Sequence, residues 1–239
     1  MSLLAAHLND AGIAVLDAER VLYREPGFAL LEEDGLRTGA EAFANARIRP
    51  RRIQNGFWAN LDVAPIADRQ FQHLSNADLA SRQLEQVWKA VAHKGDRLVV
   101  AVPAYMQHEQ LGLVLGIAEE LGVPVIAMVD AAVAATRREY RNAVPVHIDI
   151  SLHSVMLSRM AQGGVASVER SEVIRESGLL ALFDAWRKVI AEAFVQQSRF
   201  DPLHTAETEQ LLQDSLTEWL GTATTSSTFS MEIDYRGVT

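Results

Sequence analysis

The pattern of apolar and polar positions in the first quarter of the chain predicts short strands followed by a helix. Apolar runs at Gly12–Leu16, Val21–Tyr23 and Phe28–Leu31 are separated by polar or Pro-Gly turns, which is typical of strands. A threonine followed three residues later by a glutamate resembles a capping box, and it predicts a helix over Thr38–Ala46.

The middle of the chain has the clearest periodicity. An amphipathic pattern predicts a helix over Asn76–His93, and the uniformly apolar Arg97–Val102 predicts a buried strand. The next expected elements alternate between helix and strand: a helix over Glu109–Leu121, a strand over Val123–Val129, a helix from Asp130 to about Tyr140 and a strand over Val144–Ile150. This succession predicts an α/β fold in which helices cover a mostly parallel sheet.

The last third of the chain has a different pattern. Segments Ser154–Met160 and Val165–Arg170 flank a Gln-Gly-Gly turn and predict a hairpin. Two helices are expected next, at Leu179–Gln197 and Thr205–Leu220, and the alternating Ser227–Tyr235 resembles a half-exposed strand.

This change of pattern predicts two domains. The boundary falls between Tyr140 and Val146, so we assign residues 1–143 to an N-terminal lobe and residues 144–239 to part of a second lobe. The second lobe would hold a strand, a hairpin, two helices and a terminal strand. A final strand with no hairpin partner predicts that a longer natural protein has been truncated at its C-terminus.

Composition narrows the classes of function. The 239 residues carry 22 Lys+Arg against 31 Asp+Glu, a net charge of −9, which argues against nucleic-acid binding and against an anionic membrane surface. The absence of cysteine excludes disulfides, thiolate nucleophiles and Cys-ligated zinc. No apolar run approaches the ~20 residues that cross a bilayer. We therefore expect a soluble cytoplasmic protein without membrane insertion.

Six segments, in order, resemble motifs of the DnaK-type heat-shock chaperones, within the actin-like ATPase superfamily. The segments are Arg37–Ala42 (like "LVGxxA"), Val102–Gln110 (like "VPA-Y/F-F-x-x-x-Q"), Leu121–Ala135 (like "GLxVLRIINEPTAAA"), His147–Val155 (like "DLGGGTFDV"), Gly178–Asp184 (like "LGGEDFD") and Phe229–Asp234 (like "ASIEID"). The resemblance implies a ribonuclease H-like, two-lobed fold with mixed sheets and covering helices. It also implies ATP or ADP with Mg²⁺ as the ligand.

Departures from the family's two glycine-rich phosphate hairpins change the predicted activity. We align the first hairpin, "GIDLGTT" in the family, with Gly12–Ala18, where Ala14 replaces the metal-coordinating aspartate. The second, "DLGGGT", corresponds to Asp149–Ser154, in which Asp149 alone is retained. Bulky side chains would then occupy the space where backbone N–H groups approach phosphate. Losing one oxyanion-type donor typically costs roughly 10²–10³ in rate, so efficient hydrolysis is not expected.

The resemblance still gives candidate site residues by position. Asp130, which replaces the carboxylate of "NEPTAAA", and Asp149 are the catalytic candidates, and Asp149 is the metal candidate. The nucleotide-binding candidates are Gly12, Asp17, Ser151, His153 and Ser154.

Two constellations have simpler interpretations. Asp149, Ser151 and His153 alternate on one strand, but side chains two residues apart stand about 6.5–7 Å from each other, too far for a Ser–His–Asp triad. The basic run Arg47–Arg52 is interpreted as a solvated loop rather than an anion site.

The function predicted from the sequence is a catalytically degenerate, DnaK-like domain. It would act as a chaperone-related or scaffold module whose partners are other proteins. Two alternatives remain open: a genuine Mg-dependent ATPase with atypical phosphate loops, and a filament or secretion-apparatus component of the same superfamily.

Overall fold

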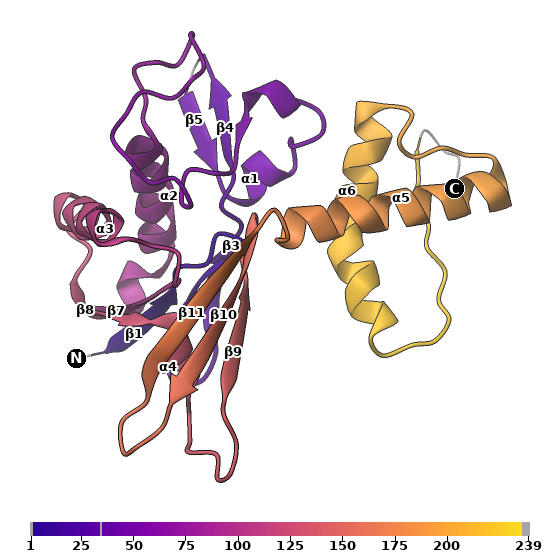
Figure 1. The fold of residues 1–239 in the computed structure, drawn as a ribbon. Helices are drawn as coiled ribbons and strands as arrows, with labels where there is room; N and C mark the ends of the chain where they lie inside the picture. The colour runs from indigo at the N-terminus through magenta and orange to yellow at the C-terminus, as the bar shows by residue number, and fades with distance from the viewer. Residues whose placement is uncertain (1, 34, 236–239) are drawn as a thin grey trace.

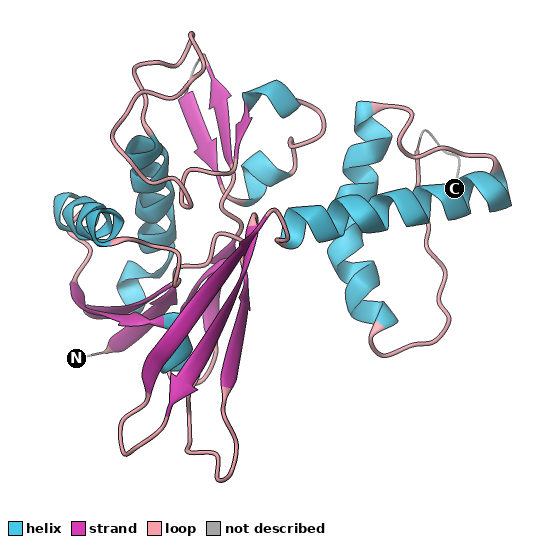
Figure 2. Cartoon of the chain, in the orientation of Figure 1, coloured by secondary structure: helices cyan, strands magenta, loops and turns pink. Residues whose placement is uncertain are grey.

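The computed structural model describes residues 2–33 and 35–235, which form a mixed α/β structure (Figures 1 and 2). A five-stranded sheet has the order β3-β2-β1-β7-β8. Its strands are β1 (Leu3–His7), β2 (Ile13–Leu16), β3 (Val21–Glu25), β7 (Arg97–Val102) and β8 (Val125–Asp130). β1 pairs antiparallel with β2, and β2 with β3, whereas β1–β7 and β7–β8 are parallel. The sheet is therefore mixed rather than mostly parallel.

The central strand of this sheet, β1, was not among the predicted strands. Leu4 is fully buried between neighbours on both sides. Two polar residues, Asn9 and Asp10, follow the strand directly, so the short apolar run before them lacks the length that identifies a core strand. The first predicted strand therefore corresponds to β2, the second strand of the structure.

Two helices cover one face of the five-stranded sheet. They are α2 (Asn76–Val91) and α3 (His108–Glu120), and their apolar residues share one core with β1, β2 and β7. Ser75 caps α2 in a capping box with Asp78, and a 3₁₀ turn, η2 (Ala92–Lys94), ends it. The amphipathic patterns that predicted these two helices are confirmed.

A small sheet lies above these helices (Figure 1). Its order is β5-β4-β6, with β4 (Ala29–Glu32), β5 (Gly35–Thr38) and β6 (Ile53–Gln54), and α1 (Ala40–Phe43) and η1 (Pro50–Arg52) connect its strands. The helix predicted over 38–46 is wrong in length. Gly39 has φ 70°, a left-handed conformation that separates strand from helix, and a side chain there would collide with the Glu25 carboxylate.

A separate antiparallel sheet follows, with the order β11-β10-β9. Its strands are β9 (Val146–Ile150), β10 (Ser154–Ala161) and β11 (Ser167–Arg175). The helix predicted from Asp130 to about Tyr140 is shorter: α4 spans Ala131–Ala135. The charged residues after Ala135 have no apolar face to bury, so the helix ends where its alanines end.

The remainder of the chain is a helix pair. α5 (Leu179–Ser198) crosses α6 (Ala206–Ala223), and Phe183, Leu212 and Leu216 lie in their shared core (Figure 1). The strand predicted over 227–235 is wrong for residues 227–234, which form no strand. Ile233 is nevertheless buried against the helices. Among the described residues, no helix is both long enough and apolar enough to span a membrane.

Candidate functional site

Two loops from the two larger sheets meet at one junction. The loop between β1 and β2 supplies Asn9 and Asp10, and the turn between β9 and β10 supplies Leu152. Asp10 Oδ1 accepts a hydrogen bond from the Leu152 backbone N–H at 2.7 Å. The Asn9 side-chain amide donates to Asp149 Oδ1 at 2.6 Å and to the Ile150 carbonyl at 3.0 Å. We call this contact the loop junction.

The β9–β10 turn is closed by its own serines. The Ser151 N–H donates to the Ser154 carbonyl at 2.9 Å, and the Ser154 N–H donates to Ser151 Oγ at 3.1 Å. The Leu152 side chain is buried with Phe28 and Leu30. With Leu152 anchored inward, its N–H faces Asp10. The N–H groups of residues 151, 152 and 154 therefore already have protein acceptors.

The start of α5 is closed by the same turn. The N–H groups of Leu179 and Leu180 donate to the carbonyls of Ser151 and Leu152, at 2.8 and 3.1 Å. A Cβ on Gly178 would collide with the Leu152 carbonyl oxygen, so only glycine permits this approach. These two amides at the helix N-terminus, a common place for anions to bind, are thus occupied by backbone oxygens.

The loop junction is acidic and buried. Burial raises the pKa of Asp10 to about 6, although the Leu152 N–H and the nearby His153 oppose the increase. For Asp149, burial alone would raise the pKa, but His7, 3.6 Å away, together with Asn9 lowers it overall. Burial, with the charges of both aspartates, raises the pKa of Tyr105 well above its ordinary value. An added phosphate would therefore meet negative charge.

Several buried polar atoms at this junction have no hydrogen-bond partner within the described part of the chain: Asp10 Oδ2, Asp149 Oδ2, Tyr105 Oη and His147 Nε2. A carboxylate oxygen accepts hydrogen bonds or binds cations, and it repels anions. In the described ranges, no three His, Asp or Glu side chains are placed to hold a metal ion together. Asp149, the predicted metal candidate, lies in this set with Asn9 on its other oxygen.

The structure separates the first group of predicted site residues. Residues 13–16 form β2, so the loop at the junction is residues 8–12, and the predicted hairpin Gly12–Ala18 reaches that loop only at Gly12. Gly12 closes the loop by donating its N–H to the Asn9 carbonyl. Asp17 lies at the opposite end of β2, where it accepts from the N–H groups of Glu19 and Arg20.

The other predicted residues have structural partners. Asp130 caps α4 by accepting from the Ala132 N–H at 2.7 Å. His153 Nε2 lies 3.0 Å from the Asn55 carbonyl oxygen. Ser151 bonds to Ser154 and Asp149 to Asn9, so among the described residues no hydrogen bond joins Asp149, Ser151 and His153 as a triad.

Sequence reasoning missed the residues that build the junction on the first sheet. Asn9 and Asp10 interrupt the apolar run at the start of the chain, and no role was predicted for them. That interruption was the available signal, since two adjacent polar residues between two apolar strands indicate a loop with a role for its side chains. Tyr105 was noted only as part of the family motif.

A second contact joins the two parts of the chain, and we call it the arginine bridge. The Arg47 N–H donates to Gln210 Oε1 at 2.7 Å, and its Nε donates to Gln213 Oε1 at 2.6 Å. Arg47 also lies 3.6 Å from Glu209, and the Gln210 amide donates to the Phe43 carbonyl. The interpretation of Arg47–Arg52 as a solvated loop is therefore wrong for Arg47, which is held against α6.

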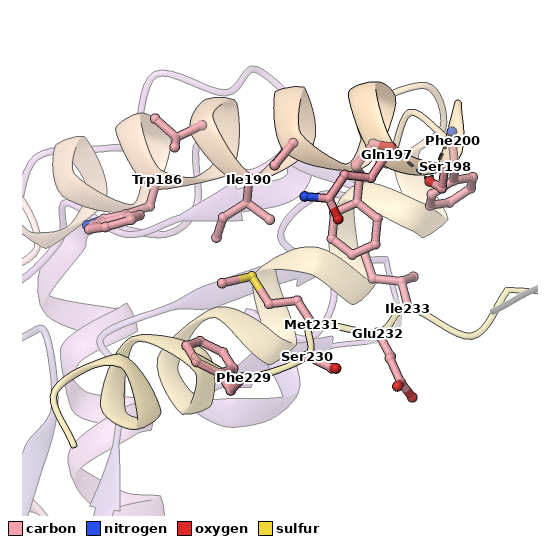
Figure 3. Close-up of a pocket in the computed structure, with 13 residues that line it drawn as sticks. Trp186, Ile190, Gln197, Ser198, Phe200, Phe229, Ser230, Met231, Glu232 and Ile233 are labelled. Carbon is pink, nitrogen blue, oxygen red and sulfur yellow. Dashed lines mark hydrogen bonds between the residues drawn. The ribbon is translucent and has the colours of Figure 1, made fainter. Parts of the chain in front are cut away.

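A groove of about 690 Å³ lies between α5 and the extended segment that follows α6 (Figure 3). Trp186, Ile190 and Phe200 line one side, and Phe229 and Met231 line the other. None of the predicted site residues borders this groove.

Neither a scan against protein-family models nor a search of curated proteins found a match. Function must therefore be argued from the junction itself.

Proposed function

We propose that this protein is a catalytically degenerate domain of the actin-like ATPase fold, which acts by binding other proteins rather than by hydrolysing ATP. The order of helices and strands supports the part of this proposal that concerns the actin-like fold. A mixed sheet with a βαβ unit is followed by a second sheet that starts at β9, and five of the six family-like segments lie on described helices and strands. In the family these two sheets belong to two lobes around a nucleotide cleft.

The loss of phosphate chemistry is supported by one contact above all, the hydrogen bond from the Leu152 N–H to Asp10 Oδ1. In the family, backbone N–H groups of this second hairpin face the phosphates. Here a carboxylate of the same chain occupies one of them, and Ser151 and Ser154 satisfy each other. A nucleotide would have to displace these bonds and bring its own negative charge beside Asp10 and Asp149.

The role in protein binding is supported by the contacts that hold the two parts of the chain together. The loop junction and the arginine bridge, two of the contacts between the two parts of the chain, are hydrogen bonds made directly between groups of the protein. A scaffold that is held together in this way keeps a fixed surface for partners after its catalytic chemistry is lost.

Isothermal titration with Mg-ATP, together with a phosphate-release assay, tests this proposal. We expect no saturable heat at micromolar nucleotide and no turnover above the buffer rate. Thermal shift with ATP or ADP and Mg²⁺ should leave the melting temperature unchanged, because a ligand that binds the folded state raises it. Micromolar binding with measurable turnover would contradict the proposal and favour the genuine ATPase.

A further inference from the structure

The sheet of β9, β10 and β11 has one covered face and one open face. On the covered face, Met156 and Met160 are buried, and Ser158 bonds to Ser171 across the strands at 2.8 Å. Helix α4 lies behind this sheet in Figure 1, and no described helix or strand lies in front of it. The opposite face is therefore left to solvent.

The open face is apolar over most of its area. The strand register places Ile150, Val155 and Ile174 in one row. The next row holds Ile148, Leu157 and the charged Glu172. The exposed fractions are 45% for Ile150, 61% for Ile148 and 41% for Ile174. Together with Val146, these residues define the open face: Val146, Ile148, Ile150, Val155, Leu157 and Ile174. A contiguous apolar patch on a folded protein marks an interaction site.

Polar residues end this patch on one side. The third row contains Arg159 and Arg170 beside Val146. Arg159 pairs with Glu169 at 2.8 Å, and Arg170 lies 3.9 Å from Glu172. The patch therefore has a polar rim whose charges are already matched, and apolar residues occupy six of the nine positions in the three rows.

The dimensions of the open face identify the kind of occupant. Three strands spaced about 4.8 Å apart, over residues that rise about 3.3 Å each, give a footprint of about 200 Å². A stable dimer needs about 800 Å² from each partner, about four times this footprint, so this face alone fits a small, transient contact rather than a stable dimer. One α-helix is about 10–12 Å wide, and roughly ten residues of it match the length of the rows.

The edge of the sheet argues against an added strand. At one end of the β9 edge stands Pro145, which has no N–H to pair with an added strand. At the other end, the Ile150 carbonyl already accepts from Asn9. The apolar side chains, moreover, point away from the sheet plane, where a strand at the edge would leave them exposed.

We propose that the open face binds one amphipathic helix of a partner protein, with apolar residues at positions i, i+3, i+4 and i+7 packed over Ile148, Ile150 and Leu157. This inference rests on the proposed function and specifies the partner that such a module would take. Ile148, at the β9 end of the middle row and 61% exposed, is the residue on which binding depends most.

The test uses two displayed peptide libraries of about 15 residues each. One has the helical apolar pattern, the other alternates apolar and polar residues like a strand, and both have the same composition. Each is selected against the wild-type chain, against Ile148→Lys and against Val165→Lys. Val165, 81% exposed in the turn between β10 and β11, is the matched control away from the open face. Circular dichroism confirms that each variant is folded.

We expect enrichment from the helical library, with micromolar binding that is retained in Val165→Lys and weakened at least tenfold in Ile148→Lys. No enrichment, enrichment from the strand library alone, or binding that Ile148→Lys leaves unchanged would overturn the proposal. A dimer in sedimentation velocity that Ile148→Lys abolishes would also overturn it, in favour of a second copy. Titration with Mg-ATP separately decides the proposed function, so the two failures are distinguishable.

Discussion

The loop junction and the arginine bridge join the same two parts of the chain. They differ in whether the buried charged group has an oppositely charged side chain beside it. At the loop junction, Asp10 is buried without a cation in contact, and its pKa rises to about 6. At the arginine bridge, Arg47 lies 3.6 Å from Glu209 and donates to Gln213, so its charge is matched.

This difference shows why the two contacts have different consequences for ligands. A matched pair adds little net charge, and partly exposed ion pairs are worth ~0–1 kcal/mol. A buried carboxylate with an unsatisfied oxygen opposes any second anion and is itself costly. The loop junction therefore opposes the approach of a second negative charge, whereas the arginine bridge holds α6 against the first part of the chain.

The largest expected effect comes from Gly178→Ala. The added Cβ would collide with the Leu152 carbonyl oxygen and lie 2.5 Å from the Ser154 nitrogen, both backbone atoms that cannot turn aside. We expect a loss of about 3 kcal/mol in the free energy of unfolding, measured by urea denaturation.

The matched control for this change is Gly163→Ala, because a Cβ at Gly163 meets nothing within 4 Å. It should change the free energy of unfolding by less than ~0.5 kcal/mol. If both alanine variants were equally stable, the close packing of α5 on the β9–β10 turn would be wrong.

A smaller effect of opposite sign is expected from Asp10→Asn. The side-chain oxygen of the introduced asparagine can still accept from the Leu152 N–H, while the buried charge is removed. A pKa raised from 3.8 to about 6 corresponds to roughly 3 kcal/mol as an upper limit. Because the new amide donor needs a partner, we expect a gain of about 2 kcal/mol at pH 8.

The same group gives a pH dependence with a definite sign. Since the pKa of Asp10 is raised in the folded state, that state binds the proton more tightly than the unfolded chain. The Asp10 contribution to stability should fall as the pH rises from about 4 to 6 and stay low above that range. Urea denaturation of wild type and Asp10→Asn across this range measures it. A difference between them that does not grow with pH would refute the assignment.

The smallest effect is expected at the arginine bridge. Arg47→Ala removes the bond to Gln213 and the contact with Glu209, but the backbone bond from residue 47 to Gln210 remains. We expect a loss of about 1 kcal/mol in the free energy of unfolding. Hydrogen exchange should quicken in α6 and remain unchanged at the β9–β10 turn. Faster exchange at that turn would show that the two contacts are coupled.

Patterns of apolar residues along the sequence predicted those helices and strands that bury one face or a continuous apolar run. Helices α2 and α3 and strand β7 were predicted almost to their ends, because their own apolar residues make the core. Strand β1 was missed because it has only five residues, too few for an apolar pattern of their own to identify a core strand. It is buried because β2 and β7 pair with it on both sides.

The loop junction could not be predicted from local sequence patterns. Asp10 and the Leu152 N–H are 142 positions apart, and no local signal links a loop carboxylate to a distant backbone amide. The resemblance located the second hairpin at the β9–β10 turn, where the structure has a turn between two strands. The resemblance placed the first hairpin over Gly12–Ala18, so Asp17 was chosen, whereas Asn9 and Asp10 carry the contact with that turn.

The backbone amide of Leu152, followed by ¹H–¹⁵N correlation spectroscopy, tests the central claim most directly. If Asp10 occupies this amide, its resonance should titrate with a midpoint near pH 6 in the wild-type protein and stay constant in Asp10→Asn. It should also remain unmoved when millimolar Mg-ATP is added. A saturable shift of the Leu152 amide at micromolar Mg-ATP would show that phosphate reaches this turn after all.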